Sequence, residues 1–154
     1  AMLPVSFAVG PSRPYPAVRH AMAEAYDTGV LAWNHRSSEF SQLYEAVLQL
    51  FIEKLGLPPG YELYFLPSAT EGWATLSEFF QGQPATHYPS GSFGARWAAQ
   101  AAALGVPVAR QAFSFDDDPA ALPLPAPGTA LLALTHNETS NGSRLPPQAW
   151  ERLA

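Results

Sequence analysis

Apolar positions along the chain repeat with two different spacings, and these spacings alternate. Apolar residues three or four positions apart, which fall on one face of a helix, are clearest over residues 38–55. Short apolar runs bounded by Gly, Pro and polar residues are typical of strands. The pattern predicts helices over residues 17–26, 38–55, 70–80 and 92–104, and a further helix that begins after Pro146-Pro147. A short apolar segment covers residues 5–9, and strands are predicted over residues 61–66, 86–88, 106–113 and 129–135.

The alternation of helices and strands predicts an α/β domain with a mainly parallel sheet flanked by helices. The strand over residues 129–135 is almost wholly apolar, which is typical of a strand buried on both faces. Ligands of such open sheets bind beyond the carboxyl ends of the strands. The candidate site therefore comprises three loops, residues 67–70, 89–94 and 136–142.

The composition narrows the classes of function. Apolar residues make up 47% of the 154 positions and charged residues 14%, which predicts a folded domain whose surface is partly covered by further protein. The net charge of -5 argues against a nucleic-acid partner. No apolar run approaches the length that spans a membrane, and the absence of cysteine excludes thiolate catalysis and fits a cytoplasmic protein.

The loop over residues 66–72 lies between a predicted strand and a predicted helix. Its small residues, Ser68 and Ala69 among them, let backbone amides approach a ligand closely. The unsatisfied N–H groups and the positive dipole end of the helix that follows favour a phosphate dianion. Alternatively, Ser68 or Thr70 only caps the helix, and the loop by itself favours this simpler interpretation.

Three further groups are candidates for ligand contacts, and each has a plain structural alternative. Phe93 follows a Gly-Ser turn and is either a ring that stacks on a flat cofactor or a core residue. Thr139 can bond a ring substituent or serve only to form a turn. The neighbouring His35 and Arg36 can grip a carboxylate or phosphate, or lie in a solvated loop before the helix.

No metal site is predicted. His35 and Glu39 lie one helical turn apart but supply two ligands without a third. Asp116-Asp117-Asp118 precedes a proline and is interpreted as a solvated loop or helix start.

Five motifs follow one another along the chain: Ser6-Phe7-Ala8-Val9-Gly10-Pro11-Ser12, His35-Arg36-Ser37-Ser38-Glu39-Phe40, Tyr64-Phe65-Leu66 followed by Ala69-Thr70, Gly91-Ser92-Phe93, and Asn137-Glu138-Thr139. Taken together and in this order, they resemble the phosphoserine aminotransferases. These motifs extend over nearly the whole chain, and their order shifts the candidate loops from the structural to the functional interpretation.

The resemblance implies a class V aminotransferase of fold type I that uses pyridoxal 5'-phosphate (PLP). Residues 1–154 would be the N-terminal part of the PLP-binding large domain, without the rest of that domain and without the C-terminal small domain. Ala69 and Thr70 would hold the phosphate of PLP, Phe93 would stack on its ring, and Thr139 would bond near the ring hydroxyl. His35 and Arg36 would bind the anionic end of the substrate, in this family often across the interface of a homodimer.

The reaction that the resemblance implies is amino transfer between phosphoserine and 2-oxoglutarate in serine biosynthesis. Such an enzyme holds PLP on a lysine as a Schiff base, yet the sequence has one lysine, Lys54, which lies in the helix pattern of residues 38–55. No catalytic residue is therefore assigned, and we expect the 154-residue chain alone to be an inactive fragment.

Two departures from the family pattern keep other functions open. Thr70 stands where some members have arginine, and Pro67-Ser68 replaces a more glycine-rich stretch. A different class V enzyme, such as a desulfurase, a lyase or another transaminase, is one alternative. A short protein that binds a partner without catalysis is the other.

Overall fold

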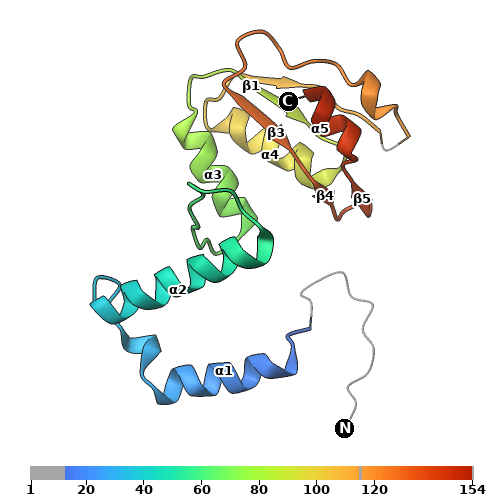
Figure 1. Cartoon of the computed structure of the whole chain (residues 1–154). Coiled ribbons are helices and arrows are strands. Elements are labelled where there is room, and N and C mark those ends of the chain that lie inside the picture. The colour runs from blue at the N-terminus through green and yellow to red at the C-terminus, as the bar shows by residue number, and fades with distance from the viewer. Residues whose placement is uncertain (1–12, 115, 154) are drawn as a thin grey trace. The chain divides into compact units, whose positions relative to one another are not determined.

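The structure is a computed structural model that describes residues 13–114 and 116–153, and the chain divides into two compact units, Ala1–Phe65 and Leu66–Ala154 (Figure 1). We describe each unit by itself. The predicted segment over residues 5–9 and the motif over residues 6–12 lie outside the described residues.

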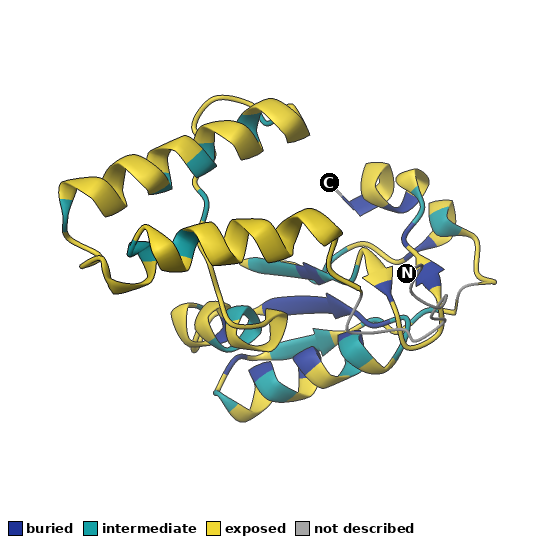
Figure 2. Ribbon diagram, turned by 90° about the horizontal axis from the view of Figure 1, so that it is seen from below, coloured by how far each residue is buried: buried dark blue, intermediate teal, exposed yellow. Residues whose placement is uncertain are grey.

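The N-terminal unit contains two helices, α1 (Pro16–Asp27) and α2 (Ser38–Leu55), with a short 3-10 helix, Val30–Ala32, between them. Both helices were predicted, and the bounds of α2 agree with the sequence pattern. The Ser37 hydroxyl accepts a hydrogen bond from the Phe40 amide at 3.2 Å, and Gly56 ends the helix at a φ of 61°. Neither helix contains a buried residue, as Figure 2 shows.

The prediction of a strand over residues 61–66 is wrong, because this segment forms no helix or strand. Side chains attach it to α2 instead: the Tyr44 hydroxyl donates to the Leu63 carbonyl, and the rings of Tyr44 and Phe65 meet edge to face with centroids 6.3 Å apart. An extended, aromatic segment becomes a strand only when a neighbouring strand completes its hydrogen bonds. None of the described strands pairs with these residues.

The C-terminal unit is built on a parallel three-stranded sheet of order β2-β1-β3. The strands are β1 (Ala85–Tyr88), β2 (Val108–Arg110) and β3 (Leu131–Leu134), and the helices are α3 (Ala69–Phe79), α4 (Ser92–Ala103) and α5 (Pro147–Leu153). This arrangement confirms the predicted α/β class, the parallel sheet and the positions of the helices. The strand predicted over residues 106–113 is shorter than expected, in part because Pro107 has no N–H to donate.

Alternate side chains of β1 build two cores, one on each face of the sheet. Ala85 packs with Ala101 of α4 on one face. Tyr88 packs with Ala149 and Leu153 of α5 on the other. All four residues of β1 are buried, since both faces of this central strand are covered (Figure 2).

The predicted loop over residues 136–142 contains an element that the sequence pattern did not indicate. Strand β4 (Asn137–Glu138) pairs antiparallel with β5 (Ser143–Arg144), in the register Asn137↔Arg144 and Glu138↔Ser143. Two-residue strands are too short to show an alternating pattern. The loop over residues 114–128 contains a 3-10 helix, Pro119–Ala121, and this agrees with the loop expected there.

None of the helices in the described ranges is both long and apolar enough to cross a membrane.

Candidate functional site

A cavity of about 390 Å³ opens in the C-terminal unit, next to the start of α3 and the residues that follow β3. It is lined by Ala69, Thr70, Trp73, Phe93, Trp97, Leu134, Thr135, His136, Asn137 and Thr139. All four residues to which the sequence assigned cofactor contacts, Ala69, Thr70, Phe93 and Thr139, are among them. The structure thus brings them together, while their roles as ligands stay predictions.

The first turn of α3 supplies donors for an anion. The Ser68 hydroxyl accepts from the Glu71 amide at 3.2 Å, so the capping interpretation holds for Ser68. The amides of Ala69 and Thr70 and the hydroxyl of Thr70 have no hydrogen-bond partner among the described residues. Because these unsatisfied donors lie at the positive end of the helix dipole, capping by Ser68 leaves the turn able to bind an anion.

Aromatic rings form one wall of the cavity. Trp73 stacks on Trp97 with ring centroids 5.8 Å apart and an interplanar angle of 9°. Phe93 lies next to Trp73 at 6.5 Å, and the Arg96 guanidinium lies 5.9 Å from the Phe93 centroid. The sequence interpretation missed both tryptophans. A signal was present, because Trp73 follows Ala69 and Trp97 follows Phe93 by four residues, which is one helical turn.

The N-terminus of α4 is occupied by a carboxylate of the chain itself. Glu138 is 1% exposed and accepts from the amides of Gly94 at 3.0 Å, Ser140 at 3.2 Å and Phe93 at 3.3 Å, and from the Ser140 hydroxyl at 2.5 Å. Burial raises the pKa of the Glu138 carboxyl, but these hydrogen bonds, that of the Ser140 side chain first, outweigh it, so the pKa lies below its ordinary value. Glu138 is therefore an ionised cap of α4.

The two helix ends next to the cavity thus differ in their capacity for an anion. The end of α4 already holds the Glu138 carboxylate, whereas the amides of Ala69 and Thr70 at the start of α3 are open. A phosphorylated ligand in this cavity would consequently place its phosphate at α3, and its remaining part would face the aromatic wall.

The segment after β3 contributes polar groups. The Thr139 hydroxyl has no hydrogen-bond partner in the part of the chain that the structure describes. His136 is held on two sides, since its Nε2 accepts from Arg144 Nε at 3.2 Å and its ring stacks on Trp150 at 5.9 Å. Thr139 is thus available for a ligand, and the orientation of the His136 ring is fixed.

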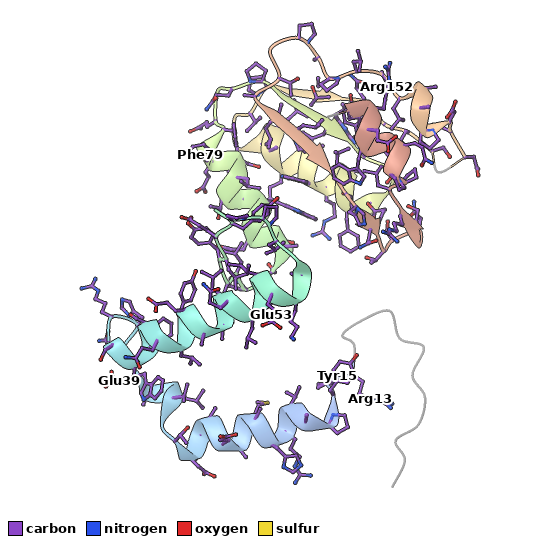
Figure 3. All side chains as sticks on the ribbon, viewed as in Figure 1. Arg13, Tyr15, Glu39, Glu53, Phe79 and Arg152 are labelled. Atoms are coloured by element: carbon purple, nitrogen blue, oxygen red, sulfur yellow. The ribbon has the colours of Figure 1, made fainter. Side chains whose placement is uncertain are left out.

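His35, Arg36 and Lys54 belong to the N-terminal unit, whereas the residues that line this cavity belong to the C-terminal unit. The Arg36 amide donates to Asn34 Oδ1 at 2.8 Å, and His35 lines a separate small cavity of that unit. Lys54 Nζ lies 2.7 Å from Oε1 of Glu53, which projects from α2 (Figure 3). Within residues 13–114 and 116–153, no group of three His, Asp or Glu side chains is placed to hold a metal ion.

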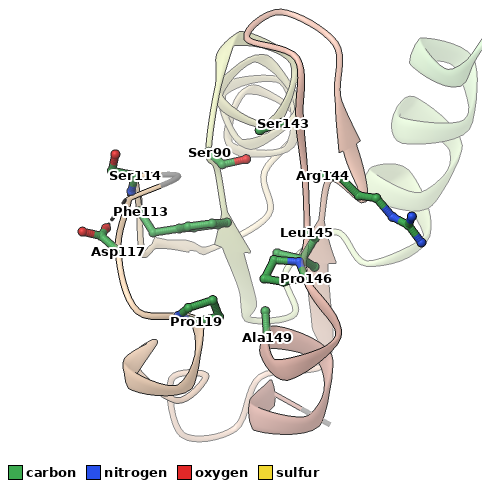
Figure 4. Close-up of a pocket in the computed structure, with 10 residues that line it drawn as sticks. All are labelled: Ser90, Phe113, Ser114, Asp117, Pro119, Ser143, Arg144, Leu145, Pro146 and Ala149. Carbon is green, nitrogen blue, oxygen red and sulfur yellow. Dashed lines mark hydrogen bonds between the residues drawn. The ribbon is translucent and has the colours of Figure 1, made fainter.

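A second cavity of the C-terminal unit, of about 240 Å³, lies between the loop after β2 and the start of α5 (Figure 4). Phe113, Leu145, Pro146 and Ala149 give it a largely apolar lining. The Arg144 side chain points away from it, toward His136, and Asp117 accepts a hydrogen bond from the Ser114 amide. The cationic side chain that could attract an anion here, Arg144, is thus directed out of this cavity.

No family model and no curated protein matches the sequence. Among solved structures, a phosphoserine aminotransferase from Cytophaga hutchinsonii is similar, with a TM-score of 0.82 and 34% identity, over 91% of this chain and 39% of its own. Another phosphoserine aminotransferase, studied for radiation damage of its Schiff base, has a TM-score of 0.74 and 25% identity, over 90% of this chain and 42% of its own. An alanine–glyoxylate aminotransferase from Nostoc sp. shares the fold, with a TM-score of 0.65 and 20% identity, over 95% and 40% of the two chains.

The chain spans about two fifths of the length of the phosphoserine aminotransferases that it matches. The parallel sheet, the order of the elements and these comparisons agree. The chain therefore has the fold of part of the large domain of a fold type I PLP enzyme, and it resembles the phosphoserine aminotransferases.

Proposed function

We propose that this chain forms the phosphate and ring cradle of PLP in an aminotransferase. The observation that supports the proposal is the meeting of Ala69, Thr70, Phe93 and Thr139 at one cavity, next to a helix end with open amides. These residues lie on three separate segments of the chain, so their convergence is a property of the fold.

The groups at the cavity fit PLP in three respects. The amides of Ala69 and Thr70 and the Thr70 hydroxyl suit a phosphate dianion, while Phe93 and Trp73 offer aromatic surface to a flat ring. The Thr139 hydroxyl suits a ring oxygen. When bound, PLP supplies the electron sink for amino transfer, and the protein supplies position and charge.

A transaminase needs a lysine that forms a Schiff base with PLP, and the C-terminal unit, which contains the cavity, has none. Lys54 is the one lysine in the sequence, and it is ion-paired with Glu53 on α2 of the N-terminal unit. We therefore propose that the 154-residue chain does not transaminate by itself and that the complete enzyme carries the lysine elsewhere.

The substrate side of the proposal follows the family resemblance. We propose that His35 and Arg36 bind the anionic end of the substrate in a cytoplasmic homodimer that transfers the amino group of phosphoserine to 2-oxoglutarate. The Arg36 side chain makes no hydrogen bond or ion pair among the described residues, which leaves its guanidinium available. Thr70 stands in place of the arginine of some members, so another amino donor stays an alternative. A comparison of amino transfer from phosphoserine and from alanine by the complete enzyme decides between the two donors.

The binding proposal is tested with pyridoxine 5'-phosphate, which has the phosphate and ring of PLP but no aldehyde to react with amines. We expect it to quench the fluorescence of Trp73 and Trp97 as it binds, and Thr70→Val to weaken its affinity by about tenfold through loss of a hydroxyl bond to a charged phosphate. Thr75→Val is the matched control, because the Thr75 hydroxyl bonds the Glu71 carbonyl within α3. No saturable binding, or equal weakening by both variants, would contradict the proposal.

The activity proposal is tested with the purified 154-residue chain, PLP, phosphoserine and 2-oxoglutarate. We expect no glutamate formation above that of free PLP, since the C-terminal unit, which contains the cavity, has no lysine. Turnover that survives removal of any longer copurifying enzyme would show that the chain is catalytic without a lysine at this cavity.

A further inference from the structure

We propose that Glu138 is a positioning residue that fastens the turn bearing Thr139 to the turn bearing Phe93, and so sets the ring-binding half of the cavity. This inference rests on the proposed function and deepens it. Glu138 does not line the cavity, and its two neighbours Asn137 and Thr139 do. Its effect on a ligand would therefore pass through the residues that it holds.

The contacts of Glu138 join two segments that lie far apart in the sequence. One carboxylate accepts the amides of Phe93 and Gly94, 45 and 44 residues away, and the amide and hydroxyl of Ser140. Two further bonds join the same turns, since the Ser92 amide donates to the Ser140 hydroxyl at 3.0 Å, and Asn141 Nδ2 donates to the Ser90 carbonyl at 2.8 Å. Glu138 is thus the buried acceptor that supplies most of the hydrogen bonds holding Phe93 in position relative to Thr139.

The two turns approach so closely that there is no room for a side chain at Gly91 or Gly94. A Cβ atom on Gly91 would lie 2.4 Å from Glu138 Cγ, 2.7 Å from its Cδ and 2.7 Å from Ser140 Oγ. A Cβ atom on Gly94 would lie 2.9 Å from the Cα of Pro89 and 3.2 Å from Thr135 Oγ1. The missing side chain of Gly91 therefore leaves room for the Glu138 carboxylate, while that of Gly94 leaves room for Pro89 and Thr135.

Only an ionised carboxylate suits this position. Every partner of Glu138 donates to it, and a carboxylate accepts through both oxygens. In Glu138→Gln one oxygen becomes an NH₂ group that faces N–H or O–H donors, and the negative charge at the positive end of α4 is lost. We expect the two turns to separate where the amide replaces the oxygen.

The phosphate half of the cavity does not depend on Glu138. Ala69 and Thr70 stand at the start of α3, which Ser68 caps, and Glu138 makes no hydrogen bond to α3. A positioning role consequently predicts that loss of the Glu138 carboxylate lowers the affinity for a phosphate ligand with a ring and leaves the affinity for inorganic phosphate unchanged. A general loss of structure would affect both.

This difference between the two ligands is measured by titrating pyridoxine 5'-phosphate and inorganic phosphate into wild type and Glu138→Gln and following tryptophan fluorescence. We expect about tenfold weaker binding of pyridoxine 5'-phosphate to Glu138→Gln, the effect of losing a hydrogen bond to a charged group, with phosphate affinity unchanged. Ser140→Ala, which removes one donor and keeps the charge, should give a smaller effect in the same direction and serves if Glu138→Gln does not fold. Glu151→Gln is the control, because Glu151 is exposed on α5 and outside the cavity.

The outcomes separate the two claims. Equal loss for both ligands, or no loss for either in Glu138→Gln, would overturn the positioning role while the proposed function stands. Failure of the wild type to bind pyridoxine 5'-phosphate would overturn the proposed function and this inference with it.

Discussion

At the scale of single residues, His87 is the buried side chain whose charge the fold opposes most clearly. It lies on the central strand β1, it is 1% exposed, and its ring meets Trp97 edge to face at 5.3 Å. Its Nε2 has no partner among the described residues. Burial, and after it the positive charge of Arg110, lower the pKa of His87 from 6.5 to about 4, so the folded chain holds it neutral.

This pKa shift predicts how stability depends on pH. Between pH 6.5 and about 4 the unfolded chain binds a proton at His87 that the folded chain does not bind, so the free energy of unfolding falls as the pH falls. One titrating group can change the free energy of unfolding by at most about 1.4 kcal/mol per pH unit, and the contribution of His87 lies below this limit. Urea unfolding at several pH values should show a shallower slope for His87→Phe, whereas His20→Gln, at an exposed position of α1, should keep the wild-type slope. An unchanged slope in His87→Phe would contradict the lowered pKa, because it would mean that the folded and unfolded chains bind protons equally at His87.

Sequence reasoning singled out residues that line the cavity and missed the residue that holds two of them in place. Thr70, Phe93 and Thr139 belong to short motifs at predicted strand ends, and the order of these motifs along the chain singled them out. Glu138 lies in the same motif as Thr139, yet its partners Phe93 and Gly94 are more than 40 residues away. A capping bond between distant segments leaves no local signature.

At the scale of elements, a prediction was accurate where residues of the same segment stabilise the element, and it failed where the element depends on a distant segment. Helix α2 carries its own start and stop signals in Ser37 and Gly56, and its predicted bounds agree with the structure. The segment over residues 61–66 has the composition of a strand, but a strand depends on a partner that composition does not provide. The hairpin of β4 and β5 is two residues long on each side and could not be predicted from spacing.

The contact between α4 and the turn after β4 yields a prediction about two glycines. Gly91→Ala places a Cβ atom 2.4 Å from Glu138 Cγ, and we expect it to lower the free energy of unfolding by about 1–3 kcal/mol, as overpacking does. Gly72→Ala is the matched control in α3, where the added Cβ meets only the flexible Leu66 side chain at 3.2 Å. There we expect little change or a gain, because alanine favours a helix over glycine. Chemical unfolding of both variants checks this, and equal stabilities would contradict the close approach at Gly91.

At the scale of the whole molecule, the alternation of helix and strand patterns was enough to predict the α/β class and the parallel sheet. The order β2-β1-β3 was not predictable, because the apolar pattern of a strand does not indicate with which other strands it pairs. Ligands of open α/β sheets bind beyond the carboxyl ends of the strands, and this general rule pointed to three loops. The cavity is lined by residues from these loops.

The exposed apolar surface leads to a prediction about association. Leu50 on α2 is 54% exposed and Phe79 on α3 is 73% exposed (Figure 3), and β3 pairs on one side only within the described sheet. Such surfaces favour contact with further protein. We expect sedimentation velocity of the purified chain to show a concentration-dependent mass above that of one chain, and Leu50→Lys to reduce it. A single monomeric species at all concentrations would contradict this expectation.

The central claim is that one cavity receives both the phosphate and the ring of PLP. The most direct measurement is a ¹H–¹⁵N correlation spectrum of the chain, assigned and titrated with pyridoxine 5'-phosphate. The account predicts that the amides of Ala69, Thr70, Phe93 and Thr139 shift together along one saturable curve. Shifts at only one of these segments, or at residues outside the cavity, would contradict it.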